Sequence, residues 1–170
     1  MIHDCHYIVL DLETGGYVIN DPKKKKPITQ VGLCVLNHKM EKVFEYSAYI
    51  KPYVELHVYE KSALDYTGTT IEKLMANGKD VGEVYADLKA IFTKYKVGRK
   101  LPVLVGHNII EFDLDFLFVF FERFKDNFMN YIESYIEDTM WISRKMWGHI
   151  DVVSHKLPDA CERMGITLIS

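Results

Sequence analysis

Two acidic residues, Asp11 and Glu13, lie between an apolar run and a glycine pair in the segment IVLDLETGG. Residues two apart on a strand project from the same face, so the two carboxylates are expected side by side. Neighbouring carboxylates repel each other, and burying them unpaired is costly. A solvent-facing strand edge would also accommodate them. The preceding apolar run predicts a central strand instead, and this favours a cation site.

A third acidic residue, Asp113, follows the apolar segment around Val103 in the stretch LVGHNIIEFDLDFL. Apolar residues recur at helical spacing after it, so Asp113 is expected near the start of a helix. A carboxylate there can also cap free amides and favour the helix dipole, which is the structural alternative. Asn108 suits the strand-to-helix turn, where its side-chain amide would hold the loop.

The remaining pattern places strands at residues 7–12, 28–36 and 42–50, with a hairpin turn at 37–39, and a further buried strand at 101–106. Helices are expected over 81–95, from Asp113 onward, and at the C-terminal end. For this last helix Ser154 is the candidate cap, Pro158 lies in the first turn and Gly165 ends it. Strands followed by alternating strands and helices predict an α/β fold with a mixed sheet flanked by helices.

Composition narrows the class of protein. The chain has 170 residues, 48% hydrophobic and 26% charged, which fits one globular domain and excludes a disordered tail or a coiled-coil rod. Its net charge of −3 argues against a basic nucleic-acid coat. Three cysteines without a CxxC pair argue against a disulfide framework or zinc site. Without a signal-like start or a long apolar run, we expect a cytoplasmic protein without membrane contact.

Taken together, these segments resemble the DEDD-type 3′–5′ exonucleases, the superfamily of polymerase proofreading subunits and oligoribonuclease. IVLDLETGG followed by ITQVGLCVL resembles the first motif, and GHNIIEFDLDFL resembles the second. Residues 137–139 and the stretch HKLPDACERMGI resemble the segments before the third motif. The resemblance implies a single exonuclease domain over residues 1–170. Its fold would be ribonuclease H-like, with a mixed central sheet whose first three strands are antiparallel and the others parallel.

The resemblance also assigns roles to single residues. Asp11, Glu13 and Asp113 match catalytic carboxylates that bind metal. A complete site would hold two Mg²⁺ or Mn²⁺ ions, because two ions can activate water and stabilise the leaving oxygen. Oxygen ligands favour these hard cations over zinc. Three other acids match no ligand position: Asp115 and Glu111 as extra acids of the second motif, and Asp138 as a structural residue.

Thr14, Tyr17 and Asn108 are the expected substrate-binding residues, and the expected substrate is the 3′ end of single-stranded DNA or RNA. Tyr17 would stack on a terminal base or pack on its own loop. The lysine run at 23–26 is either a solvated surface or a clamp for the nucleic-acid backbone. Family members also imply a DNA polymerase or a second copy of the chain as candidate partners.

The third motif supplies a fourth carboxylate, with a histidine base five residues before it or a tyrosine four residues before it. The segment that precedes this motif runs to Ser170, so the domain is expected to lack the motif. His155 with Asp159 is an internal candidate, one residue too short in spacing. Two hypotheses follow: a metal-dependent exonuclease, and a non-catalytic nucleic-acid-binding or scaffolding domain that keeps the fold. A nucleotide-cleaving hydrolase is a third.

Overall fold

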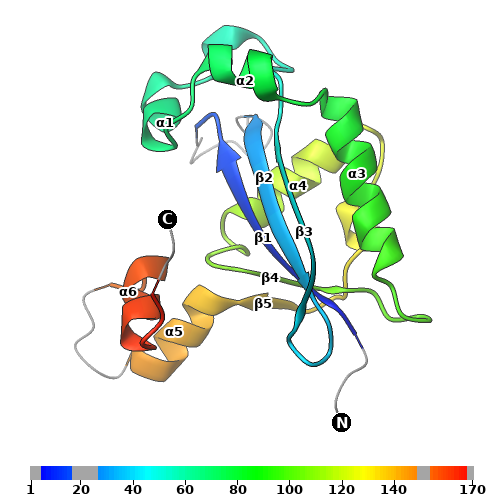
Figure 1. Cartoon of the computed structure of the whole chain (residues 1–170), viewed down its shortest axis with the longest axis vertical. Coiled ribbons are helices and arrows are strands. Elements are labelled where there is room, and N and C mark those ends of the chain that lie inside the picture. The colour runs from blue at the N-terminus through cyan, green and yellow to red at the C-terminus, as the bar shows by residue number, and fades with distance from the viewer. Residues whose placement is uncertain (1–4, 17–26, 149–153, 168–170) are drawn as a thin grey trace.

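A five-stranded mixed sheet lies at the centre of the computed structural model, which describes residues 5–16, 27–148 and 154–167 (Figure 1). The strand order is β3-β2-β1-β4-β5. β1 pairs antiparallel with β2, and β2 with β3, whereas β1–β4 and β4–β5 are parallel. The predicted fold class is therefore confirmed. The strands are β1 (Tyr7–Thr14), β2 (Ile28–Leu36), β3 (Lys42–Tyr49), β4 (Val103–Gly106) and β5 (Ile136–Asp138).

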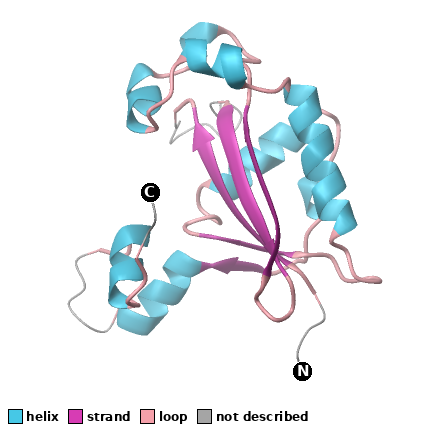
Figure 2. Cartoon of the chain, in the orientation of Figure 1, coloured by secondary structure: helices cyan, strands magenta, loops and turns pink. Residues whose placement is uncertain are grey.

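Helices surround this sheet in three groups (Figure 2). α3 and α4 pack along one face of it, α1 and α2 lie beyond the end of β1, and α5 and α6 follow β5 (Figure 1). The bounds are α1 Lys61–Tyr66, α2 Ile71–Asn77, α3 Val81–Lys94, α4 Asp113–Glu122, α5 Thr139–Trp147 and α6 Leu157–Arg163, with 3₁₀ turns η2 Leu56–Val58 and η3 Phe128–Asn130.

Burial alternates along β1, as a sheet with one packed face requires. Ile8, Leu10 and Leu12 are buried in the main core, whereas Asp11 and Glu13 project from the opposite face. The core is completed by aromatic residues of α4 and by α3, including Phe92, Phe116 and Phe121. The prediction that β1 is central and carries its acidic pair on one face is therefore confirmed.

The C-terminal helix differs from its prediction. Lys156, not Ser154, occupies the cap position of α6, and the Ser154 hydroxyl donates a hydrogen bond to Asp159. Leu157 and Met164 are exposed, so the apolar face of this helix is not buried in the core. Four elements had no counterpart in the sequence interpretation: α1, α2, β5 and α5. Each is short, and hydrophobic periodicity is weakest in short elements.

Two further predictions concern the chain as a whole. The three cysteines are unpaired, as expected without a disulfide framework. Within the described ranges, no helix is both long enough and apolar enough to cross a membrane. Even α4, with its run of phenylalanines, has only ten residues.

We expect Phe121→Ala to lower the free energy of unfolding by about 3–5 kcal/mol, since deleting a buried ring leaves a cavity. Phe121 is fully buried and its ring lies 5.0 Å from that of Phe128 and 5.3 Å from that of Tyr85. Urea unfolding measures the change. Tyr66→Ala is the matched control: that ring is 92% exposed, so its loss should change stability by about 0.5 kcal/mol or less. Equal losses would contradict the assigned core.

Candidate active site

Asp11 and Glu13 leave the same face of β1 near its carboxyl end. Asp11 keeps contact with solvent, yet the protein around its carboxylate raises its pKa, and the nearby His107 opposes this rise. Partial burial also raises the pKa of Glu13, and the negative charge of Asp11 raises it further. The two carboxylates are therefore close enough to repel each other, as the spacing predicted.

Asp113 is the first residue of α4 and only 3% of its surface is exposed. Its carboxylate accepts a hydrogen bond from the backbone amide of Leu12 at 3.0 Å. The parallel pairing of β1 with β4 ends at Val9 and Val105. The Leu12 amide lies beyond this pairing and donates to the Asp113 carboxylate instead. Burial, followed by the charge of Asp11, raises the pKa of Asp113 to about 7, despite the opposing hydrogen bond from Leu12.

The loop between β4 and α4 is held by a second buried carboxylate, that of Asp138. It accepts hydrogen bonds from the backbone amides of Asn108 (2.9 Å), Ile110 (3.2 Å) and Met140 (2.9 Å). Asp138 therefore caps α5 and fixes the loop at once, which agrees with the structural role expected for it. Asn108 has a positive φ of 61°, a conformation that asparagine tolerates better than most residues.

A cavity of about 470 Å³ opens beside Glu13, between the end of β1 and α1. We call it the α1 pocket; its walls include Glu13, Thr14 and Phe112. Gly16 allows the segment after β1 to lie close to Glu60. Its φ is +129°, and an added Cβ would lie 2.7 Å from the Glu60 side chain. This volume is in the usual range for small-ligand sites. The other lining residues are Leu12, Gly16, Glu60, Ser62, Ala63, Tyr66 and Thr67.

His107 lies on the other side of Asp11 and lines a second cavity, of about 410 Å³, on the open face of the sheet. Both of its ring nitrogens have partners: Nδ1 is 2.9 Å from the Thr139 hydroxyl, and Nε2 is 2.9 Å from the His155 carbonyl oxygen. Nε2 must carry hydrogen to donate to that carbonyl. His107 is thus a hydrogen-bonded structural residue.

The internal candidate for the third motif makes its hydrogen bonds elsewhere. The His155 ring pairs with the Ser143 hydroxyl at 2.9 Å, and Asp159 accepts from Ser154. Both contacts connect residues of the α5–α6 region to one another. His155 and Asp159 therefore serve this region's own packing in the structure.

The other sequence-predicted residues have varied positions. Thr14 lines the α1 pocket, and its hydroxyl donates to the Gly16 carbonyl at 3.2 Å. The side-chain oxygen of Asn108 is buried without a protein partner among the described residues, so it could accept a hydrogen bond from a ligand. Glu111 is exposed. Tyr17 and the lysines at 23–26 lie outside the described residues.

The donor chemistry of the site fits a hard divalent cation. Asp11 raises the pKa of both Glu13 and Asp113, so a positive ion placed among them would relieve the repulsion. Their oxygen atoms are the ligands that Mg²⁺ and Mn²⁺ prefer. In the described part of the chain, however, no three acidic, histidine or cysteine side chains are grouped closely enough to hold an ion. Side-chain movement would be needed to bring them together.

The sequence interpretation missed the α1 pocket and the place of Phe112 in it. Nothing between residues 53 and 80 indicated an element that would approach β1. The one local signal was the pair Gly15–Gly16, which we interpreted only as a break after the strand. Pockets formed by short elements distant in sequence depend on tertiary contacts that periodicity does not encode.

Comparison with solved structures places this geometry among known folds. No protein-family model and no curated protein matches the sequence. E. coli exonuclease I in complex with a dT13 oligonucleotide superposes with a TM-score of 0.76 at 17% identity, over 96% of this chain and 36% of that one. The chain shares the fold of part of exonuclease I.

Two other structures of exonuclease I support the same fold. A product-bound structure has a TM-score of 0.76 at 17% identity, covering 97% of this chain and 39% of that chain. A complex named ExoI/SSB-Ct has the same TM-score and identity, covering 97% of this chain and 37% of that chain. This chain thus spans less than two fifths of each of these exonuclease I chains. Its ribonuclease H-like architecture is confirmed.

The raised pKa of Asp113 predicts a pH-dependent stability. Between its unfolded value near 4 and its folded value of about 7, the native carboxyl holds a proton that the unfolded chain has lost. The free energy of unfolding therefore falls as pH rises through this window. Asp113→Asn keeps an acceptor for Leu12 but cannot ionise. Relative to wild type, we expect the free energy of unfolding of this variant to increase as pH rises from 4 to 8 without metal. The increase should be on the order of a few kcal/mol.

Urea unfolding of both proteins at pH 4, 6 and 8 in the presence of a chelator measures this difference. The comparison of the two proteins at each pH removes contributions from the other titrating groups. Parallel stability curves across the range would show that Asp113 does not carry a raised pKa.

Proposed function

We propose that this chain is a metal-dependent exonuclease domain that hydrolyses phosphodiester bonds from the 3′ end of single-stranded DNA. One observation carries the proposal. Burial raises the pKa of three carboxylates near the carboxyl end of the central strand, those of Asp11, Glu13 and Asp113, and the charge of Asp11 raises the last two further; Glu13 lines a pocket of about 470 Å³. Clustered acids with raised pKa values beside a pocket are typical of catalytic sites.

Asp11, Glu13 and Asp113 are the residues that would hold Mg²⁺ or Mn²⁺. Two such ions, when bound, activate water and stabilise the leaving oxygen of a phosphodiester. The protein itself positions these three ligands. Because Asp113 is fixed by the Leu12 amide and Asp11 by the strand, each ligand lies on a rigid element.

The α1 pocket is the proposed binding place of the terminal nucleotide. Glu13 and Phe112 line it together, which offers an acidic group near the scissile phosphate and a ring for contact with the base. Exonuclease I has been crystallised with a dT13 oligonucleotide and with product. By extension we propose single-stranded DNA here, and RNA as the related substrate to be compared. Thr14 and Asn108 are proposed to contact the substrate.

The alternative is a non-catalytic nucleic-acid-binding or scaffolding domain. The observation that favours it is the spread of the three carboxylates, since no metal-binding group of three occurs within the described ranges. A single domain over residues 1–170 without the third motif stays a prediction. Association with a DNA polymerase or a second copy, and a cytoplasmic location, are likewise predictions.

We expect Asp11→Asn, Glu13→Gln and Asp113→Asn each to lower Mn²⁺-dependent cleavage by at least about 100-fold, because each removes a proposed metal ligand. A 5′-labelled single-stranded oligonucleotide resolved on a sequencing gel would show the ladder of shortened products that 3′–5′ cleavage produces. Asp115→Asn is the matched control and should keep most activity. Asp115 is two residues along α4, so its side chain is directed roughly 200° away around the axis.

Circular single-stranded DNA, which has no 3′ end, should not be cut. Cleavage of the circle would indicate an endonuclease. Loss of activity in Asp115→Asn with activity kept in Asp113→Asn would contradict the assignment of Asp113. Activity on free nucleotides but not on oligonucleotides would favour the nucleotide-cleaving alternative.

Metal stoichiometry is expected to be low in the 170-residue chain. Three carboxylates leave two divalent ions with uncompensated positive charge, and one oxygen of Asp113 already accepts from Leu12. Calorimetric titration with Mn²⁺ should therefore give one weak site that Asp11→Asn removes. Two tightly bound ions with rapid cleavage would show that a fourth ligand exists in the chain, and His155 with Asp159 would be tested next.

A further inference from the structure

Helix α5 follows the three candidate carboxylates in the sequence and carries an exposed indole, that of Trp141. Trp141 is 51% exposed and lines a cavity of about 500 Å³ together with Ile110, Ile136 and Ile142. An indole exposed to this extent beside apolar side chains is available for contact with a ligand, and tryptophan is enriched at binding surfaces. Its flat face beside an apolar floor is suited to stacking with a planar group.

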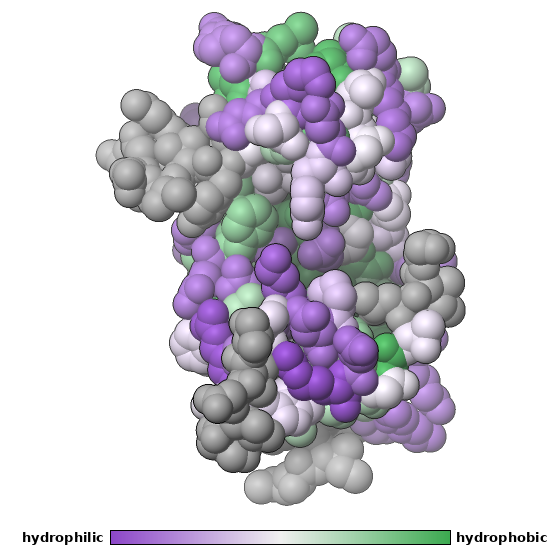
Figure 3. Space-filling view, turned by 90° about the vertical axis from the view of Figure 1, so that its left-hand side faces the viewer, coloured by the Kyte–Doolittle hydropathy of each residue, from purple (hydrophilic) through white to green (hydrophobic). Residues whose placement is uncertain are grey.

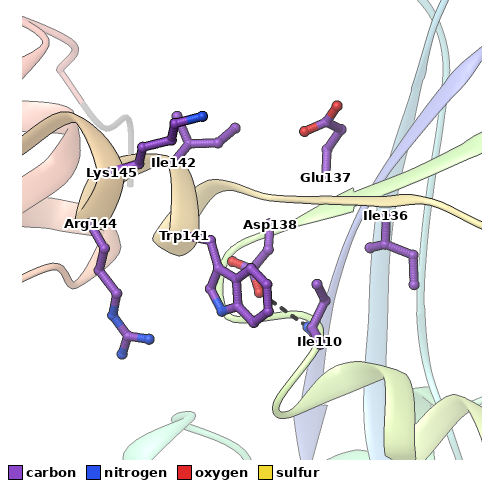
Figure 4. Close-up of a pocket in the computed structure, with 8 residues that line it drawn as sticks. All are labelled: Ile110, Ile136, Glu137, Asp138, Trp141, Ile142, Arg144 and Lys145. Atoms are coloured by element: carbon purple, nitrogen blue, oxygen red, sulfur yellow. Dashed lines mark hydrogen bonds between the residues drawn. The ribbon is translucent and has the colours of Figure 1, made fainter.

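A cation lies one helical turn from this indole. Arg144 is three residues after Trp141 on α5, and Figure 4 shows both side chains on the same side of the β5–α5 ribbon. The Arg144 guanidinium is 4.0 Å from the Glu111 carboxylate, with the two side chains 50% and 55% exposed. An exposed ion pair at this distance is weak. The guanidinium can therefore exchange this carboxylate for a phosphate, which it binds well.

The acids of this cavity do not cancel that charge. Asp138 is buried and its carboxylate already accepts three backbone amides. Glu137 projects from the opposite side of the ribbon, where Lys145 also points (Figure 4). The side that carries Trp141 and Arg144 therefore combines an aromatic face with a cation, the two contacts that single strands need.

This cavity adjoins the candidate active site through one loop. The loop connects β4 to α4; Ile110 lines the Trp141 cavity and Phe112 lines the α1 pocket. The Asp138 carboxylate holds the loop from the cavity side, while Asp113 begins the helix at its other end. Figure 3 shows this face of the molecule hollowed between the part formed by α1 and α2 and the part formed by α5 and α6.

We propose that Trp141 and Arg144 form a second binding site for single-stranded nucleic acid, which holds nucleotides upstream of the one in the α1 pocket. The inference rests on the proposed function for the direction of the strand. Trp141 stacks on a base and Arg144 binds a phosphate of the same strand. Binding at this site is independent of metal, because neither residue is a proposed metal ligand.

The test measures binding of fluorescent oligothymidylates by polarisation in the presence of a chelator. Trp141→Ala should weaken binding of an oligonucleotide of about ten nucleotides by about tenfold, while Trp141→Phe keeps a ring and most of the affinity. Neither variant should change the affinity for a dinucleotide, which fills only the α1 pocket.

Arg144→Ala should weaken binding of the long oligonucleotide about threefold or more and reduce the dependence of log Kd on log salt by about 0.7. Lys42→Ala is the matched control: it removes one positive charge from an exposed, ion-paired lysine of β3 that does not line this cavity, and it should change affinity less than twofold. In a Trp147→Phe background, Trp141 is the sole indole. Its fluorescence should be quenched by the long oligonucleotide and not by the dinucleotide.

Equal losses for Arg144→Ala and Lys42→Ala would mean a diffuse charge effect and would overturn the proposal. Unchanged affinity in Trp141→Ala, without quenching in the Trp147→Phe background, would overturn it too. The proposed function fails separately, if Mn²⁺-dependent cleavage is absent. If the long oligonucleotide binds in a way that depends on the Trp141 ring but is not cleaved, the second site is supported and the chain is a nucleic-acid-binding domain.

Discussion

The Asp113 carboxylate accepts the backbone amide of Leu12 and so joins the first turn of α4 to the end of β1. Parallel pairing with β4 stops at Val9, and without this acceptor the Leu12 amide would be buried without a partner. One hydrogen bond thus connects α4 to the end of β1 and holds an acid near Asp11. The positions of Asp113 and of Phe112, which precedes it and lines the α1 pocket, depend on this contact.

A second buried aspartate repeats the device one strand further. Asp138, at the end of β5, accepts amides from the loop after β4, so two carboxylates fix the two ends of the same segment. Their difference is instructive. Asp138 has three amide donors, whereas Asp113 has the Leu12 amide and faces the negative charge of Asp11. Charge without sufficient donors is what a site for a cation requires.

Sequence patterns predicted those parts of the molecule that local periodicity controls. The alternation in β1 placed Asp11 and Glu13 on one face, and the apolar stripe after Asp113 placed it at the start of α4. The α1 pocket could not be predicted, because α1 has only six residues and buries only Leu64. Ser154 was wrongly assigned as a cap, since its hydroxyl has a better partner in Asp159. Such choices depend on neighbours brought close by the fold.

The strand order has a further consequence. From β1 the chain continues to β2, which lies toward one edge of the sheet. From β4 it continues through α4 to β5, which lies at the opposite edge. Connections that diverge in this way leave a crevice outside the carboxyl ends of the two central strands. The crevice is therefore a property of topology and not of the acids within it. A descendant that lost these carboxylates would lose the proposed metal site and keep the crevice.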